Sequence, residues 1–249
     1  MRMTKQQIKD NARIQAWLEG EEFRENSRAK PSVPNLSRND VLEDWTPPCV
    51  SAMGQFFTPY SMVEKLHPWT HGRYARAKPY TVLDPCAGIG HLLTDFNHAA
   101  YDVLALEMQY ETFYLGRKLF PGFRWEHWNA LQHLPRWEGR SDHLEGQFDI
   151  VVCNPPYNST QGMHDRLEGF ESGAKKSHQL FLELCVRALK PDGIAVMIGP
   201  YNLITGLPKQ AAAWFEDNAQ VVDMLGPLYG EFKHTKMQVH AYMIKRKEN

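Results

Sequence analysis

The pattern of polar and apolar positions changes near residue 52 of the chain. Before this point, residues 4–24 are mostly polar with apolar residues at helical spacing, which predicts an amphipathic helix with Thr4 as a candidate N-cap. Residues 27–48 are rich in proline, asparagine, serine and charge, which is typical of an irregular connection. We therefore expect an N-terminal extension over residues 1–50 and one main domain over residues 51–249.

From residue 52 onward, short apolar runs alternate with helical patterns. The expected strands are Thr81–Asp84, Asp102–Glu107, Phe123–Asn129, Phe148–Asn154, Gly193–Gly199, Val221–Leu225 and Val239–Lys245. The expected helices are Ser61–His67, Gly90–Ala100, Gln109–Leu119, His178–Leu189 and Lys209–Asn218. Because strands that alternate with helices need crossover connections, this order predicts an α/β fold with a mixed, mainly parallel, seven-stranded sheet and helices on both faces.

Ligands of such sheets bind beyond the carboxyl ends of the strands, so the residues that follow each strand are candidate site residues. After the first strand, the chain runs Asp84-Pro-Cys-Ala-Gly88-Ile-Gly90. Two glycines two positions apart allow a tight turn and a close approach of a ligand to the backbone, although an ordinary strand-to-helix turn has the same requirement. A dinucleotide motif needs a small residue where this chain has Leu93, which weakens an NAD interpretation.

Polar side chains end the next two strands. Glu107 could accept hydrogen bonds from both ribose hydroxyls of a nucleoside, or be a solvated charge at a strand end. Asn129 could read the Watson–Crick edge of an adenine. Asp84, at the end of the first strand, is placed to face a cationic or amine-bearing ligand.

The fourth strand ends in Asn154-Pro155-Pro156-Tyr157, the most specific motif of the chain. The prolines fix φ and carry no backbone donor, so the loop is stiff and its carbonyls remain acceptors. The Asn154 side chain and the Pro155 carbonyl form a pair of acceptors suited to one NH₂ group, and Tyr157 supplies a planar face for a heterocycle. An ordinary Pro-Pro strand terminator would explain the prolines but not the flanking asparagine and tyrosine.

With these motifs the chain resembles the γ-class S-adenosylmethionine-dependent adenine-N6 DNA methyltransferases. The segment Gln55-Phe56-Phe57-Thr58-Pro59 resembles the family's motif ten, and the order of the motifs is the γ order. The resemblance covers roughly residues 52–247 and implies a Rossmann-like methyltransferase fold. It also implies transfer of a methyl group from S-adenosyl-L-methionine to the N6 amine of an adenine in DNA, with the base flipped out of the duplex.

The resemblance assigns roles to individual residues. Those implied to bind the cofactor are Phe57, Thr58, Pro59, Asp84, Cys86, Ala87, Gly88, Gly90, Glu107, Asn129 and Asn154. Those implied to be catalytic are Asn154, Pro155, Pro156 and Tyr157. Tyr157 and Phe232 would stack on the target base, although Phe232 is equally well explained as a core residue. The neutral acceptors of Asn154 and Pro155 would stabilise the positive charge that develops on the amine, so no titrating base is needed for the attack.

The chain departs from the family in one respect, because no separate target-recognition domain is evident. Specificity would then come from the polar loop over residues 158–176, from residues 1–50, or from a partner such as a specificity subunit or a second copy. The loop carries Arg166, Lys175 and Lys176, which could contact phosphates, and we expect it to order over the flipped base. Arg73, Arg76 and Lys78 form a second basic cluster.

Three other functions share these motifs. A protein-glutamine methyltransferase uses the same Asn-Pro-Pro-Tyr sequence on a side-chain amide, and an RNA adenine methyltransferase differs only in its substrate. The third is a DNA-binding or regulatory subunit without turnover, or a methyltransferase that depends on a specificity partner.

Composition excludes several classes of protein. The 249 residues carry 28 Lys and Arg against 29 Asp and Glu, so a basic surface that binds nucleic acid over its whole area is not expected. The longest apolar run, residues 194–198, is too short to cross a bilayer, and the N-terminus lacks the apolar core of a signal peptide, so we expect a cytoplasmic protein. The four cysteines form no CxxC pair and the histidines show no ligand spacing, so we expect neither a disulfide framework nor a metal.

Overall fold

The computed structural model describes residues 5–6, 8–15, 42, 58–71, 79–96, 99–131, 144–157, 169–228 and 238–247. The chain divides into two compact units, Met1–Ala52 and Met53–Asn249. In the first unit, residues 5–6 and 8–15 are helical and Ile14 is buried. The remainder of the helix expected over residues 4–24 lies outside the described residues, as does the expected connection over residues 27–48 apart from Leu42.

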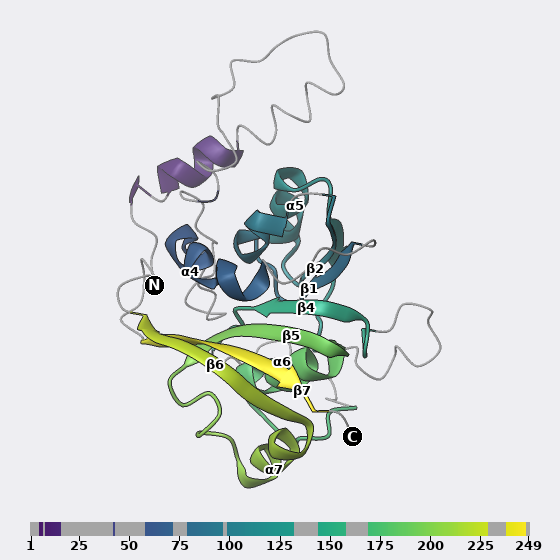
Figure 1. Ribbon diagram of the computed structural model, residues 1–249. Helices are drawn as coiled ribbons and strands as arrows, with labels where there is room; N and C mark the ends of the chain where they lie inside the picture. Colours follow the sequence, from purple (N-terminus) through teal and green to yellow (C-terminus); the bar gives the residue numbers. More distant parts are fainter. Residues whose placement is uncertain are drawn as a thin grey trace, which may run out of the picture. The chain divides into compact units, whose positions relative to one another are not determined.

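The second unit alternates strands with helices, as Figure 1 shows. Its strands are β1 (Tyr80–Asp84), β2 (Tyr101–Glu107), β3 (Arg124–His127), β4 (Phe148–Cys153), β5 (Leu189–Pro200), β6 (Ala219–Leu228) and β7 (Val239–Arg246). Its helices are α4 (Tyr60–Thr70), the 3-10 helix η1 (His91–Phe96), α5 (Tyr110–Leu119), α6 (Ser177–Ala188) and α7 (Lys209–Asn218). All seven expected strands are therefore present.

The seven strands form one sheet in the order β3-β2-β1-β4-β5-β7-β6. Strands β1 to β5 pair in parallel, whereas β7 runs antiparallel to both β5 and β6. The predicted mixed, mainly parallel sheet is confirmed. Since the order reverses between β1 and β4, the carboxyl ends of these two strands flank the switch point where α/β sheets bind ligands.

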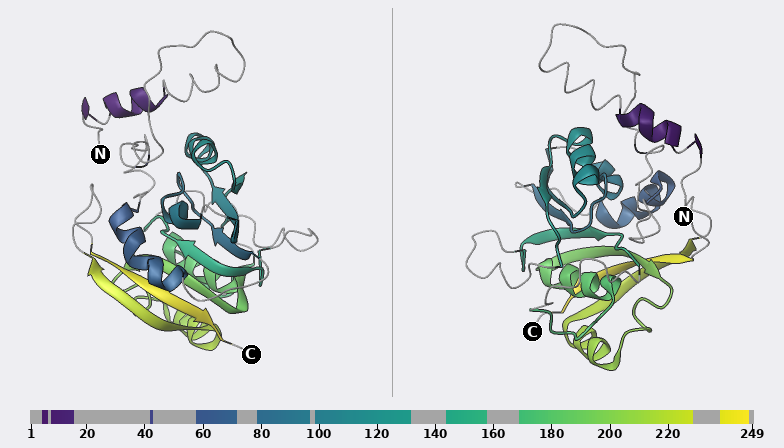
Figure 2. Two further views of the ribbon diagram at one scale, coloured as in Figure 1. Left: turned by 45° about the horizontal axis from the view of Figure 1, so that its top comes forward. Right: turned by 180° about the vertical axis from the view of Figure 1, so that it is seen from behind.

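Side chains of the central strands alternate between two covering layers of helices (Figures 1 and 2). Leu83 of β1, Val151 and Cys153 of β4 and Met197 of β5 belong to one core with the buried faces of α6 and α7. The intervening positions, such as Val82 and Val152, face the opposite layer, where α4 and η1 pack together. The same alternation determines which of the two layers is faced by the side chain of the residue that follows each strand.

Several element boundaries differ from the expectation. The helix expected over residues 90–100 is the short 3-10 helix η1, which follows two glycines with positive φ, Gly88 at 58° and Gly90 at 96°. The third strand ends at His127, so Trp128 and Asn129 lie beyond it. Strand β5 begins at Leu189, directly after α6, and pairs there with Phe148. The expected strand begins at Gly193 because Pro191, Asp192 and Gly193 are typical turn residues, and the pairing register with β4 shifts across them.

Among the described residues, no helix has both the length and the apolar character that crossing a membrane requires.

Candidate active site

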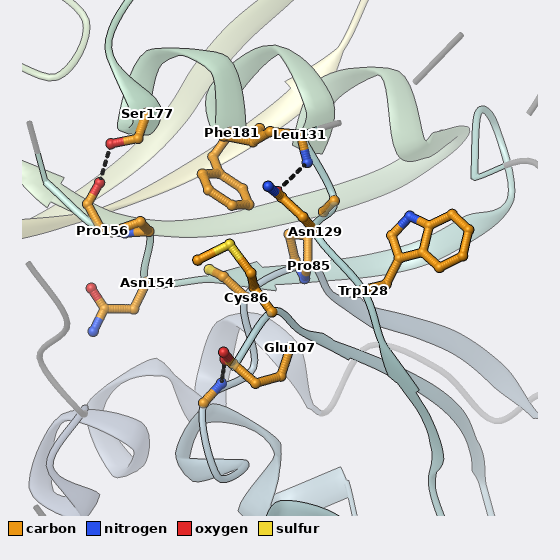
Figure 3. Close-up of a pocket in the computed structure, with 13 residues that line it drawn as sticks. Pro85, Cys86, Glu107, Trp128, Asn129, Leu131, Asn154, Pro156, Ser177 and Phe181 are labelled. Atoms are coloured by element: carbon orange, nitrogen blue, oxygen red, sulfur yellow. Dashed lines mark hydrogen bonds between the residues drawn. The ribbon is translucent and has the colours of Figure 1, made fainter. Parts of the chain in front are cut away.

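A pocket opens at the carboxyl ends of β1, β2, β3 and β4, where the topology places a ligand (Figure 3). Its lining combines one carboxylate, two side-chain amides, a hydroxyl and several apolar or aromatic groups. The residues are Pro85, Cys86, Gly88, Glu107, Met108, Trp128, Asn129, Ala130, Leu131, Asn154, Pro156, Ser177 and Phe181. In the view of Figure 3, Asn154 and Trp128 lie at opposite ends of this pocket.

Glu107 ties the glycine turn to the end of β2. Its Oε2 accepts a hydrogen bond of 2.9 Å from the Gly88 amide, and its Oε1 accepts one of 2.7 Å from the Gln109 amide. Gly88 adopts a φ of 58°, a conformation that a residue without a Cβ reaches at little cost. The predicted carboxylate and the predicted glycine therefore meet, and both line the pocket.

Two buried carboxyls give this region an unusual electrostatic character. Burial raises the pKa of Asp84 to about 8. The Cys86 amide, which donates to Asp84 Oδ1 over 3.1 Å, opposes this shift, and the nearby Glu107 carboxyl contributes to it. Burial also raises the pKa of Glu107 to about 7, although backbone amides counteract the shift. Neither carboxyl has a cationic side chain as a partner within the described part of the chain. A bound cation would lower both pKa values.

The other residues predicted in the glycine turn have structural contacts. The Ala87 amide donates to the Leu106 carbonyl over 2.9 Å. Gly90 is buried, and a Cβ at this position would lie 2.8 Å from the Phe120 ring, so only glycine fits. Of the described residues that line the pocket, none is Asp84, Ala87 or Gly90. Cys86 does line it, with its Sγ 3.5 Å from Cys153 Sγ, and burial raises the pKa of the Cys86 thiol to about 12.

The end of β3 supplies the far wall of the pocket. Asn129 Oδ1 accepts a hydrogen bond of 3.1 Å from the Leu131 amide, which fixes the turn after the strand (Figure 3). Trp128 and Met108 lie beside Asn129 in the pocket lining. Aromatic and apolar groups with one amide are the chemistry that holds a nucleobase.

Asn154 lines the opposite end of the pocket, and both ends of its carboxamide are hydrogen-bonded. Its Nδ2 donates to Thr58 Oγ1 over 3.0 Å, and its Oδ1 accepts from the Tyr157 hydroxyl over 2.6 Å. The Pro156 carbonyl accepts a hydrogen bond of 2.6 Å from the Ser177 hydroxyl at the start of α6. The predicted motif is thus anchored to the segment before α4 on one side and to α6 on the other.

Tyr157 differs from the expectation. It was expected to present a planar face to a heterocycle, but its side chain is 8% exposed and is not among the described residues that line the pocket. Its hydroxyl contacts Asn154 and, at 3.3 Å, the Ile198 carbonyl. The reason is that the stiff Pro-Pro turn directs the ring back toward β5, where two acceptors are within reach. Stacking on a base therefore requires this side chain to move.

Part of the predicted site lies outside the described residues. The residues concerned are Phe57, Phe232, Arg166 and the basic cluster of Arg73, Arg76 and Lys78. Thr58 and Pro59 are described, and Pro59 precedes α4. Lys175 and Lys176 are exposed immediately before α6.

The pocket contains residues that the motifs do not indicate. Ser177 and Phe181 lie one helical turn apart on α6, and Leu131 follows the turn after β3. Their signal in the sequence is positional, because a helix that follows β4 begins at the same edge of the sheet as the strand ends. Among the described residues, no group of three or more histidine, cysteine or acidic side chains is arranged to hold a metal ion.

The residues present fit a nucleoside cofactor that carries positive charge. Glu107 offers carboxylate oxygens for ribose hydroxyls, and the Trp128 end offers the apolar lining for a purine. The buried Glu107 carboxyl, with no cationic side chain beside it in the described part of the chain, suits a ligand that bears positive charge.

Comparison with known sequences gives one family and two curated relatives. Residues 105–225 match the model of the Eco57I restriction-modification methylase family. The modification methylase CviBIII of Paramecium bursaria Chlorella virus NC1A is 25% identical over 156 residues, which cover 61% of this chain and 39% of that protein. A tRNA1(Val) (adenine(37)-N6)-methyltransferase of Shewanella woodyi is 29% identical over 136 residues, which cover 52% of this chain and 56% of that protein. The chain thus spans about half, or less, of the length of these relatives.

Solved structures establish the fold. A class I S-adenosylmethionine-dependent methyltransferase from Listeria monocytogenes superposes with a TM-score of 0.66 at 17% identity, covering 98% of this chain and 86% of that one. A modification subunit of a type I restriction enzyme from Vibrio vulnificus YJ016 gives a TM-score of 0.64 at 16% identity, covering 86% of this chain and 51% of that one. The expected cofactor is therefore S-adenosyl-L-methionine. The chain has the Rossmann-like fold of class I S-adenosylmethionine-dependent methyltransferases, and the resemblance to adenine-N6 methyltransferases that its motifs indicate is confirmed.

Proposed function

We propose that this protein methylates the N6 amine of adenine in DNA and that Asn154 is its central catalytic residue. The observation that carries the proposal is the position of Asn154 at one end of a pocket whose other end suits a nucleoside (Figure 3). The match of residues 105–225 to restriction-modification methylases and the similarity to a modification methylase favour DNA as the substrate.

Different residues of the pocket would bind different parts of the cofactor. Glu107 would accept hydrogen bonds from the ribose hydroxyls of S-adenosyl-L-methionine, and Gly88 lets the backbone approach the ligand. Trp128, Met108 and Asn129 would hold the adenine ring of the cofactor. When bound, this cofactor would supply the methyl group of its sulfonium and be left as a neutral thioether, and the acceptor nitrogen would lose one proton to water after the transfer. The protein supplies placement.

Asn154 would act on the acceptor amine. The lone pair of an exocyclic adenine amine is delocalised into the ring, so the nitrogen is a poor nucleophile. Acceptance of its N–H bonds by Asn154 Oδ1 and the Pro155 carbonyl would localise the lone pair and stabilise the positive charge that forms on attack. Because Tyr157 donates to the same oxygen, its hydroxyl must share or leave Oδ1 when the amine arrives.

Access to the amine requires the base to leave the duplex, at a cost of a few kcal/mol. Stacking on an aromatic side chain contributes about 1–3 kcal/mol per base and would offset much of this cost. Tyr157 is the described aromatic residue closest to the catalytic amide, and Phe232 is the second candidate. We propose that both hold the flipped base, with Tyr157 turned out of its buried position.

RNA adenine is the second candidate substrate, because the similarity to the Shewanella woodyi enzyme covers about half of the chain at 29% identity. The chemistry at Asn154 would be identical, so the substrate would be decided outside the pocket. A specificity partner or a second copy of the chain would supply sequence recognition in either case.

The test is to express the protein in a bacterial host that lacks adenine methylation and to quantify N6-methyladenine by mass spectrometry. DNA, transfer RNA and ribosomal RNA are purified separately, and Asn154→Ala serves as the inactive control. We expect N6-methyladenine in DNA with the wild-type chain and at least about a hundredfold less with Asn154→Ala. The modified base in RNA alone would favour the second candidate, and full activity of Asn154→Ala would refute the mechanism.

A further inference from the structure

We infer that Thr58 is a positioning residue that fixes the orientation of the Asn154 carboxamide, rather than a ligand of the cofactor. This inference rests on the proposed catalytic role of Asn154 and assigns Thr58 a role that its motif does not imply. It follows from a contact between two segments that lie 96 positions apart in the sequence.

The contact is direct and enclosed. Thr58 is 3% exposed, and its Oγ1 accepts the hydrogen bond of 3.0 Å from Asn154 Nδ2. Thr58 directly precedes Pro59, whose φ of −64° and ψ of 149° lead into α4. Because α4 buries Met62, Val63 and Leu66, the backbone that carries Thr58 is held firmly beside the end of β4.

Strand parity explains why these two residues meet. Cys153 faces the core formed with α6, so the next residue continues the alternation toward the layer that contains α4. Asn154 therefore extends its side chain toward the segment before α4, where Thr58 lies. A serine or threonine at position 58 places a hydroxyl within hydrogen-bond distance of the Asn154 carboxamide, whereas an apolar residue offers no acceptor there.

A carboxamide needs such a contact if it is to work as an oriented acceptor. The terminal torsion of an asparagine side chain is broad, so the carboxamide plane rotates easily when nothing holds it. Here Thr58 holds the nitrogen end and Tyr157 contacts the oxygen end. When Tyr157 leaves to stack on a base, Thr58 still holds Nδ2, and this contact keeps Oδ1 directed at the amine. Loss of orientation at a reacting centre is costly in rate even when every reacting group is still present.

The resemblance to motif ten would instead place Thr58 at the methionine end of the cofactor. In the structure, the described residues that line the pocket do not include Thr58, and its hydroxyl contacts Asn154. The two roles predict different kinetics. A cofactor ligand affects the affinity for S-adenosyl-L-methionine, whereas a positioning residue affects the rate of transfer from the saturated complex.

The experiment compares Thr58→Val, which is nearly isosteric but cannot accept a hydrogen bond, with Thr58→Ser, which keeps the hydroxyl. We expect Thr58→Val to lower the single-turnover rate at saturating cofactor by about tenfold, the effect of one hydrogen bond. The Kd for S-adenosyl-L-methionine, measured by calorimetry, should change by less than about twofold, and Thr58→Ser should recover most of the rate. A weaker Kd with an unchanged rate at saturation would overturn the inference, as would a Thr58→Val variant with normal values of both.

A matched control comes from the same helix. Thr70 is also buried, and its hydroxyl contacts the Leu66 and His67 carbonyls at the far end of α4. Thr70→Val removes a comparable hydroxyl from α4 without touching Asn154, so its rate should stay at the wild-type value. Melting temperatures of both variants show whether α4 remains folded.

A readout without substrate separates this inference from the proposed function. In a sample labelled with nitrogen-15 at asparagine, the Asn154 side-chain signal is the one that Asn154→Ala removes. We expect this signal to shift and its protons to exchange faster in Thr58→Val than in the wild type or in Thr70→Val. An unchanged signal would refute the positioning role. A shifted signal in a protein that methylates neither DNA nor RNA would refute the proposed substrate and leave the positioning role intact.

Discussion

The Tyr157 hydroxyl donates a hydrogen bond of 2.6 Å to Asn154 Oδ1, the oxygen that the proposed mechanism assigns to the target amine. The residue proposed to hold the base and the residue proposed to activate it therefore contact one another. In the proposed mechanism, the Tyr157 hydroxyl shares this oxygen with the amine or leaves it when the amine arrives. The role of the Tyr157 hydroxyl can therefore be separated by mutation from the role of its ring.

Tyr157→Phe should retain methyl transfer within about fivefold of the wild type, because the ring can still stack and only one hydrogen bond is lost. Tyr157→Ala should lose at least about tenfold, since stacking contributes about 1–3 kcal/mol per base. Single-turnover rates with saturating cofactor measure both effects, and Kd for S-adenosyl-L-methionine should not change in either variant. Equal losses in the two variants would show that the hydroxyl, and not the ring, matters.

Glu107→Gln should weaken cofactor binding by about tenfold. The carboxylate accepts from the Gly88 and Gln109 amides with different oxygens, whereas a glutamine has only one acceptor oxygen for the two amides and the ligand. Calorimetric titration with S-adenosyl-L-methionine provides the measurement. The control is Glu111→Gln, an exposed acidic residue at the start of α5 that should leave the affinity unchanged.

Stability should fall as the pH rises from about 4 to about 8. Burial raises the pKa of Asp84 to about 8 and that of Glu107 to about 7, from ordinary values of 3.8 and 4.5. Between the ordinary and the raised values the folded chain binds more protons than the unfolded chain, so its free energy of unfolding decreases with pH. Asp84→Asn should flatten this decrease, because asparagine keeps an acceptor for the Cys86 amide and cannot ionise.

Thermal unfolding at several pH values measures this effect without any ligand. Asp102→Asn, at an exposed position of β2, is the control and should follow the wild-type curve. A melting temperature that rises through this pH range in the wild type would contradict the assignment of buried, protonated carboxyls.

Lys175 and Lys176 should contribute to nucleic-acid binding through phosphates. They are exposed immediately before α6, whose first residue Ser177 contacts the Pro156 carbonyl. Reversal of both charges with Lys175→Glu and Lys176→Glu should weaken binding to a DNA duplex. It should also reduce the slope of log K against log salt by about two, close to one unit per lost phosphate contact.

The control for this effect is Lys118→Glu, in the last turn of α5. The end of α5 precedes β3 and so lies at the amino-end edge of the sheet, away from the pocket. An unchanged salt slope in the lysine double variant would exclude these two residues from the binding surface.

The sheet was predictable because its strands are short, apolar and separated by helical patterns. The candidate site was predictable where a polar side chain stands at the end of a strand or within two residues after it, as at Glu107, Asn129 and Asn154. In each case the residue type, the strand end and the rule for ligand position agree.

Other parts of the site depend on tertiary contacts that local patterns do not encode. Ser177 and Phe181 enter the pocket only because α6 crosses behind β4, and the contact between Thr58 and Asn154 joins segments distant in sequence. Tyr157 is predicted to stack on a heterocycle because its ring offers a planar face, but two nearby acceptors hold its hydroxyl inside the domain. The helix expected over residues 90–100 begins at His91, after the positive φ angles of Gly88 and Gly90, but it already ends at Phe96, which no local pattern indicates.

The alternation of side chains along β4 constrains how this protein can change. Cys153 faces one layer and Asn154 the other, so a single-residue insertion or deletion inside β4 would direct the carboxamide away from Thr58. Point substitutions in the strand can be absorbed by local repacking, whereas a change in its length inverts the direction of the reactive amide. Evolution and engineering can therefore vary the composition of β4 but must preserve its residue count.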